Sequence, residues 1–157
     1  MPIRSLTEST LDYHRGRILA LEENTPALWG GMTATSMLSH LRALTEASLG
    51  DLEVPQVIPP LVGRPIGLLI FYVLPIIPRG KPGSKPPIPA LCPAPEGTFE
   101  NERQSLLDVM ERFVALRAAK PGFKTRHPIL GRTTLARWSR VHGVHNRRHY
   151  RQFGLED

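Results

Sequence analysis

Hydrophobic residues recur every three or four positions in four segments of the chain, a spacing typical of helices that bury one face. The first segment begins at Ser5, which can form a capping box with Glu8, and ends before Pro26. The second follows Thr33, a residue type that caps helices, and ends at Gly50. The expected inward stripes are Leu11, His14, Ile18 and Leu21 in the first segment, and Met37, His40, Leu44 and Ala47 in the second.

Two further helical segments lie in the second half of the chain. The third begins after Thr98, covers residues 99–119 and is terminated by Pro121 and its neighbours. The fourth is capped by Thr133 or Thr134 and closes at Gly154. Because no segment alternates apolar and polar residues as a strand does, the pattern predicts an all-α four-helix bundle.

A long proline-rich stretch separates the second and third of these segments. Residues 54–97 contain 12 of the 16 prolines, which lack the amide donor that regular helices and central strands need. We therefore expect a long loop within a single domain that spans residues 1–157. The apolar run over residues 66–77 is too short to cross a bilayer, and it predicts a short buried or interfacial helix before Pro75. No membrane partner is expected.

Composition adds few constraints. The formal net charge of +6 is compatible with a polyanionic partner, but the arginines lack interleaved aromatic residues and no nucleic-acid motif is present, so nucleic acid is not the expected partner. Cys92 is the only cysteine, which excludes an internal disulfide and an all-cysteine metal site. The first residues lack the apolar stretch of a signal peptide, and we expect a cytoplasmic protein.

Three histidines fall within eight residues of the sequence VHGVHNRRHYRQFG, and all three lie on the inward stripe of the last helix. His142 and His149 are separated by about 10.5 Å along a helix axis. Metal–nitrogen bonds measure only about 2.0–2.1 Å, so these two cannot share an ion in a regular helix. His145 and His149 are four residues apart, the step by which H-E-x-x-H metalloenzymes present two imidazoles to zinc.

A catalytic metal site of this type usually needs a third protein ligand, which must come from another element. The candidates are His14, His40 and His127. The first two lie on apolar stripes and His127 precedes a proline in a loop, so periodicity favours the helical pair without choosing between them. The alternative is that an inward histidine is a hydrogen-bonded core residue, and that His127 bonds the backbone near the last helix.

Four stretches of the chain are similar, in order and spacing, to a subgroup of DinB-like proteins. They are ALWGGMTATSMLSHL (27–41), LIFYVLPIIPRGKP (69–82), HPILGRTTLARW (127–138) and HNRRHYRQFG (145–154). The resemblance implies a four-helix bundle whose metal is held by His40, His145 and His149. It leaves three roles open for His142, which could hydrogen-bond to a ligand, carry protons to and from the site, or be a polar lining residue. The chain departs from the subgroup at Arg148, where members often carry a further histidine.

The same resemblance implies a function. DinB-like proteins include thiol-dependent transferases and isomerases, and many are described as metal-dependent hydrolases. We therefore expect a zinc or nickel ion that activates water or a low-molecular-weight thiol against a small-molecule substrate, in a protein that forms a homodimer. No carboxylate is marked as a general base, since Glu46 is not clearly on the face of His40. The alternative is a non-catalytic metal-binding or structural, stress-associated bundle.

Overall fold

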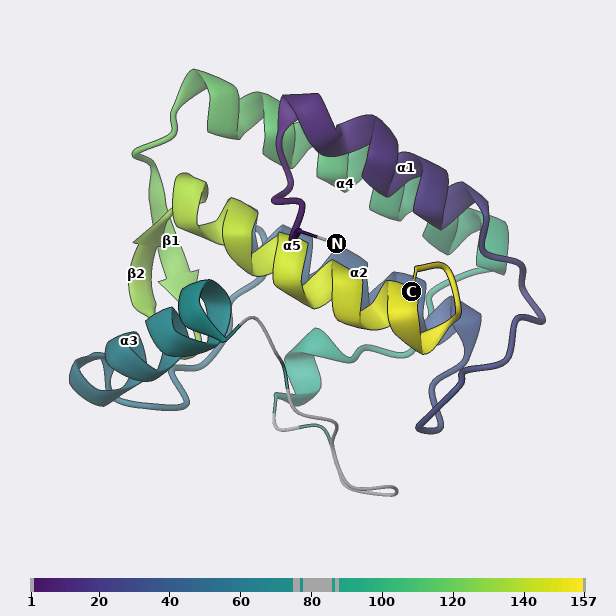
Figure 1. Ribbon diagram of the computed structural model, residues 1–157, viewed down its shortest axis with the longest axis horizontal. Coiled ribbons are helices and arrows are strands. Elements are labelled where there is room, and N and C mark those ends of the chain that lie inside the picture. The colour runs from purple at the N-terminus through teal and green to yellow at the C-terminus, as the bar shows by residue number, and fades with distance from the viewer. Residues whose placement is uncertain (1, 75–76, 78–85, 87, 157) are drawn as a thin grey trace.

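Four helices pack side by side and a β-hairpin lies at one end of them (Figure 1). The computed structural model describes residues 2–74, 77, 86 and 88–156. Helix α2 packs on α4, α1 lies along α4, and α5 packs on α2. The helices are α1 (Leu11–Leu19), α2 (Ala34–Leu49), α3 (Pro60–Leu68), α4 (Phe99–Ala119) and α5 (Leu135–Gln152), with short turns η1 (Glu8–Thr10), η2 (Leu69–Val73) and η3 (Pro89–Leu91).

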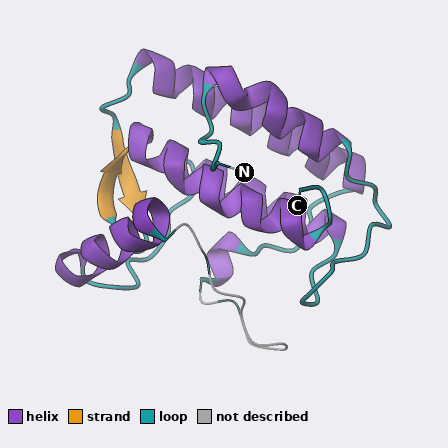
Figure 2. Cartoon of the chain, in the orientation of Figure 1, coloured by secondary structure: helices purple, strands orange, loops and turns teal. Residues whose placement is uncertain are grey.

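The prediction of an all-α four-helix bundle is wrong. Over the described residues the chain is a mostly helical mixed α/β fold, because it also contains a fifth α-helix, α3, and two antiparallel strands (Figure 2). Strand β1 (Lys124–His127) pairs with β2 (Gly131–Thr134). Each strand has only four residues, so each offers two inward positions, too few to produce a visible alternation in the sequence.

Capping side chains set the starts of the main helices. Thr33, Thr98 and Thr134 each accept a hydrogen bond from a backbone amide of the first turn, and Gly50 ends α2 with a left-handed φ of 87°. The predicted starts and the stop at Gly50 are therefore confirmed. The first helix begins later than expected, because Thr7 rather than Ser5 forms the capping box.

The apolar run at residues 66–77 is helical from Ile66 to Val73, before Pro75 as predicted, but the helix starts earlier than the run. Helix α3 begins at Pro60, where the fixed φ of proline suits the first turn, and it continues into the π-helical turn η2. The expectation for Pro75 and for most of residues 75–87 lies outside the described residues. In the part of the chain that is described, no helix has both the length and the apolar character needed to cross a membrane.

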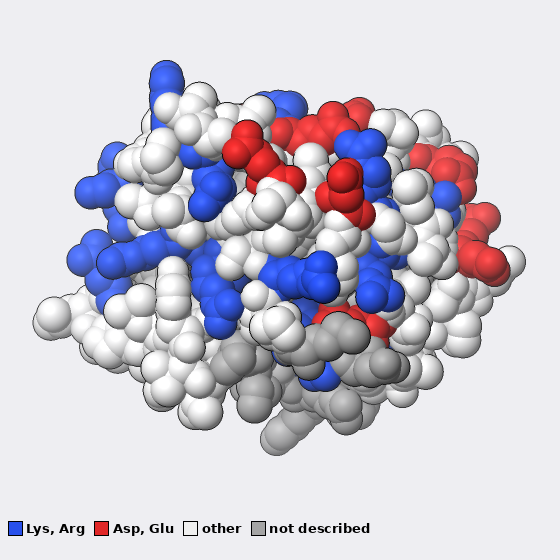
Figure 3. Space-filling model, turned by 45° about the horizontal axis from the view of Figure 1, so that its top comes forward, with Lys and Arg blue, Asp and Glu red and all other residues white. Residues whose placement is uncertain are grey.

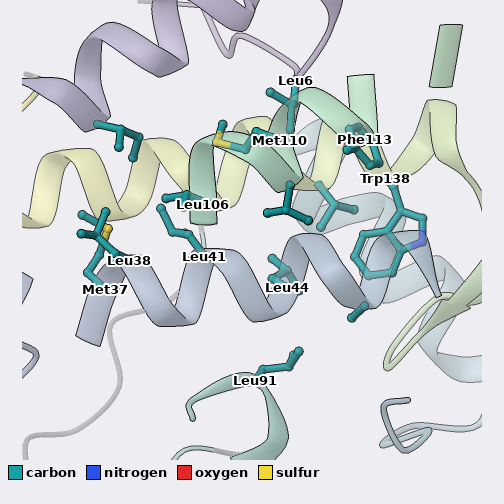
Figure 4. Close-up of a cluster of buried hydrophobic side chains, with 14 of the residues drawn as sticks. Leu6, Met37, Leu38, Leu41, Leu44, Leu91, Leu106, Met110, Phe113 and Trp138 are labelled. Carbon is teal, nitrogen blue, oxygen red and sulfur yellow. The ribbon is translucent and has the colours of Figure 1, made fainter. Parts of the chain in front are cut away.

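The core lies between α1, α2, α4 and α5 and includes Leu6 of the N-terminal segment, and Figure 4 shows part of it. Leu38 and Leu41 of α2 face Leu106 and Met110 of α4, and Leu6 belongs to the same cluster. Each of these five side chains is almost fully excluded from solvent. This packing fixes α2, and therefore His40, relative to the rest of the helices.

Candidate metal centre

The structure brings His40, His145 and His149 together. His40 lies near the middle of α2, and the other two histidines lie one turn apart in the second half of α5, which packs on α2. The three ring centroids are separated by 4.7, 4.8 and 5.0 Å. One nitrogen from each ring lies within 4.8 Å of the others, so the rings can hold a metal ion between them.

The Nε2 atoms of His40 and His145 are 3.0 Å apart. Two imidazole nitrogens bound to one tetrahedral ion would be separated by about 3.3 Å, given metal–nitrogen bonds of about 2.0–2.1 Å. The observed separation is within a few tenths of an ångström of that value. These two side chains therefore need only small shifts to act as ligands of a common ion, and the ligand nitrogen of His149 lies within 4.8 Å of theirs.

Two of the three rings are oriented by hydrogen bonds on their outer nitrogen. His40 Nδ1 donates to the backbone carbonyl of Leu91 in η3, and His149 Nδ1 donates to Oε1 of Gln152 at 2.8 Å. Gln152 in turn donates from Nε2 to the carbonyl of Trp29 at 2.9 Å. Donation from Nδ1 leaves Nε2 of each ring unprotonated, which is the tautomer that a metal ion bound at Nε2 requires.

His145 differs from its two neighbours. Its Nδ1 is buried and has no hydrogen-bond partner among the residues that the structure describes, and its Nε2 faces Nε2 of His40. A buried polar atom without a partner calls for an explanation, and an ion held by the other nitrogen of the ring would be one. Three neutral imidazoles that lie together are also a donor set that suits a divalent ion, so the residues present fit a metal ion.

Burial sets the charge of the cluster. Loss of solvation lowers the pKa of His149 to about 3, and lowers the pKa of His145 well below its ordinary value of 6.5. It also lowers the pKa of His40. The Arg148 guanidinium contributes to each of these shifts by electrostatic repulsion. All three imidazoles are therefore neutral at pH 7 and available as ligands.

The comparisons place the chain in a family. The family model described as "Protein of unknown function (DUF1569)" matches residues 2–155. The chain belongs to the DUF1569 family. Neither the search of curated proteins nor the search of solved structures finds a match to it.

The other candidate histidines of this DUF1569 protein lie outside the cluster. His14 Nε2 donates to the carbonyl of Arg4 at 3.2 Å, and its Nδ1 accepts from the Tyr150 hydroxyl at 3.0 Å. His127 Nδ1 accepts from the backbone amides of Ile129 and Leu130 in the hairpin turn. Both rings are therefore engaged as hydrogen-bonded core residues, which was the alternative interpretation of each.

His142 packs one turn away from the ligand group. Its Nε2 donates to Ser48 Oγ at 2.9 Å, because that hydroxyl itself donates to the carbonyl of Thr45. The ring stacks on Trp138 and meets the edge of Phe113. Its hydrogen bond and ring contacts are thus made to a buried polar and aromatic cluster rather than to the three clustered histidines.

Three features of the DUF1569 site were not assigned from the sequence. Gln152 lies on the inward stripe at three residues from His149, a spacing that could have suggested its hydrogen bond. The Leu91 carbonyl and the neighbouring Cys92, whose Sγ is 3.4 Å from His40 Nδ1, come from the proline-rich segment. No sequence signal places that segment against α2. Glu46, the carboxylate weighed as a base, instead accepts from Arg42 Nη1 at 3.1 Å.

Proposed function

We propose that this protein binds one divalent ion, zinc or nickel, through His40, His145 and His149 and uses it in catalysis on a small molecule. The observation that carries the proposal is that three neutral imidazoles lie together in the fold. In two of them, His40 and His149, a hydrogen bond from Nδ1 holds the ring in place. Nitrogen ligands suit both metals. The resemblance to DinB-like proteins supports the same ligand set.

A divalent ion held by His40, His145 and His149 would supply Lewis-acid chemistry, since it would lower the pKa of a bound water to about 7 or would bind a thiolate. The residues of this chain supply the rest. Leu91 and Gln152 hold the rings of His40 and His149 in the required tautomer. Arg148 adds positive charge beside three neutral ligands, which favours an anionic group at the centre. We therefore propose a hydrolase or a thiol S-transferase.

The first experiment measures metal content by elemental analysis of the purified protein and of two variants. His145→Ala removes a ligand, and His142→Gln removes a histidine of the same helix that lies outside the ligand group. We expect about one zinc or nickel ion per chain in the parent and in His142→Gln, and far less in His145→Ala. Circular dichroism checks that each variant is folded. Equal metal content in the parent and in folded His145→Ala would refute the assignment.

A second candidate is a purely structural metal site, which the burial of His149 and of His145 Nδ1 favours. The two candidates differ in whether an external ligand can reach the ion. Cobalt-substituted protein titrated with a low-molecular-weight thiol should develop a thiolate-to-metal absorption band if a coordination position is open. A spectrum that does not respond to thiol, to azide or to pH indicates a closed structural site.

Two wider expectations accompany this proposal. The free thiol of Cys92 is consistent with a cytoplasmic location, where cysteines stay reduced. The resemblance to DinB-like proteins implies a homodimer, which light scattering after size-exclusion chromatography tests directly. A monomer at micromolar concentration would contradict that expectation without affecting the metal site.

A further inference from the structure

Exposed apolar side chains are concentrated on α3 and η2. Among the described residues, twelve large hydrophobic side chains are exposed, and eight of them lie between Leu61 and Leu74. Leu61 is 89% exposed and Val73 is 67% exposed. We call these eight side chains the apolar patch. Such a concentration on one segment is unusual for a surface that faces only water.

Glycines fix the direction in which this segment faces. A Cβ added to Gly63 would lie 2.1 Å from the backbone oxygen of Ile129, and one added to Gly67 would lie 2.3 Å from Leu130 Cδ2. The helix is therefore seated on the hairpin turn by its smallest residues, and its large apolar residues point outward. This arrangement is the reverse of an ordinary surface helix, which turns its large apolar residues toward the core.

Basic residues border the apolar patch. Residues 60–74 and 124–140 contain six lysines and arginines and no aspartate or glutamate. Arg126 and Arg132 are directly opposed across the hairpin, both exposed, although opposed like charges destabilise a strand pair. In the space-filling view, the left side carries lysine and arginine but no acidic residue, above an uncharged region at the lower left, whereas basic and acidic residues are mixed at the centre and right (Figure 3).

We propose that α3 and η2 dock on the surface of a membrane that contains anionic lipids. The apolar patch enters the boundary between headgroups and acyl chains, and the basic border contacts lipid phosphates and carboxylates. A second copy of the chain would bring six like charges toward six others, which charge repulsion opposes. A nucleic acid would leave the apolar patch in water. The proposal revises the expectation that the protein has no membrane partner, and it does not depend on the metal centre.

The experiment is co-sedimentation with vesicles of phosphatidylcholine alone or mixed with phosphatidylserine. We expect binding to the mixed vesicles that weakens as salt increases. Arg126→Gln with Arg132→Gln should weaken binding roughly 25-fold, because each basic residue near such a surface contributes about fivefold. The matched control neutralises Arg15 and Arg112, which pair with acidic residues away from the patch. It should bind as the parent does.

The apolar contribution has its own pair of variants. Leu61→Gln with Val73→Gln should reduce binding more than tenfold, since both side chains leave water on docking. Leu19→Gln changes an exposed leucine of α1 outside the patch and should have little effect. Binding that is unchanged in the patch variants overturns the proposal. The proposal is also overturned if the parent protein does not bind the mixed vesicles but forms a concentration-dependent dimer that the Leu61 and Val73 variant does not form. The apolar patch would then be a contact between two copies of the chain.

Discussion

Gln152 is the residue whose removal tests how the candidate metal centre is oriented. Its side chain is 6% exposed and links His149 Nδ1 to the carbonyl of Trp29 through two hydrogen bonds. The turn at Gly30 packs on the same amide, since a Cβ added to Gly30 would lie only 3.2 Å from Gln152 Nε2. Gln152→Ala leaves the buried His149 Nδ1 without its acceptor, so the ring loses the contact that fixes its tautomer.

The magnitude follows from the role of that contact. Loss of a hydrogen-bonding partner behind a metal-ligating histidine typically weakens metal binding 10- to 100-fold. Expressed as free energy this is about 1.4–2.7 kcal/mol. Because Gln152 is not one of the three clustered histidines that could hold the ion, the number of ligands should not change. We expect Gln152→Ala to retain one metal ion per chain at saturation but to bind it more weakly.

The assay is competition for zinc against a chromophoric chelator of known affinity. Gln152→Glu keeps an acceptor for His149 Nδ1 and should bind zinc more tightly than Gln152→Ala does. Gln104→Ala removes an amide that bonds only to Asp108 on the exposed side of α4, and it should match the parent. An affinity equal to that of the parent in folded Gln152→Ala would refute the argument that this amide positions the ring.

Two further predictions concern the fold. Gly143→Ala should lower the free energy of unfolding, measured in urea, by about 1–3 kcal/mol, because its Cβ would lie 2.5 Å from the backbone oxygen of Arg4. Gly16→Ala is the matched control in a helix, since its Cβ would meet no atom within 4 Å, and it should raise the free energy of unfolding by up to about 1 kcal/mol. Acid should destabilise the metal-free protein, because burial lowers the pKa of three histidines that stay neutral in the fold. Below pH 6.5 the unfolded chain therefore binds more protons than the folded protein does. The contribution to the free energy of unfolding is complete above that pH, and it falls by about 1.4 kcal/mol per histidine for each pH unit toward pH 4. Equal unfolding midpoints at pH 7 and pH 5 would contradict this. The histidines are His14, with a pKa of about 4, and His127 and His142, with pKa values of about 3.

The helix boundaries could be predicted because they are determined by local chemistry. Thr33, Thr98 and Thr134 bond amides within their own first turns, so the interaction is contained in four consecutive residues. The same locality explains the error at the first helix. Ser5 and Thr7 both precede suitable partners, and the choice depends on Ser139, whose hydroxyl and carbonyl bond the backbone of Leu6 across the fold.

The β-hairpin and α3 could not be predicted in the same way, because tertiary contacts stabilise them. Thr125 Oγ1 donates to the carbonyl of Ser48 at the end of α2, which ties β1 to a helix distant in sequence. Helix α3 contains Pro65 and two glycines, so its intrinsic helix propensity is low. It is held by close contact with the hairpin turn, which only the assembled fold provides.

In the candidate site too, local geometry could be predicted from the sequence and tertiary contacts could not. The pairing of His145 with His149 follows from helical geometry alone. The choice of His40 rested on resemblance, because the sequence of one helix does not show which residues of another helix it contacts. The orientation of His40 depends on the Leu91 carbonyl, which belongs to the proline-rich stretch. No periodicity could have placed that carbonyl beside α2.

A buried charge network holds the end of that stretch in place. Glu102 is 2% exposed, accepts from Arg42 Nε at 3.1 Å and from the backbone amide of Glu96 at 2.6 Å. An unpaired carboxylate at that depth would be costly, and the two bonds offset the cost by tying α4 to α2 and to the segment that precedes α4. The segment carrying Leu91 is therefore anchored only four residues beyond Cys92. Because Arg42 lies two residues from His40, the same helix turn positions both the candidate ligand and the charge that secures the backbone orienting it.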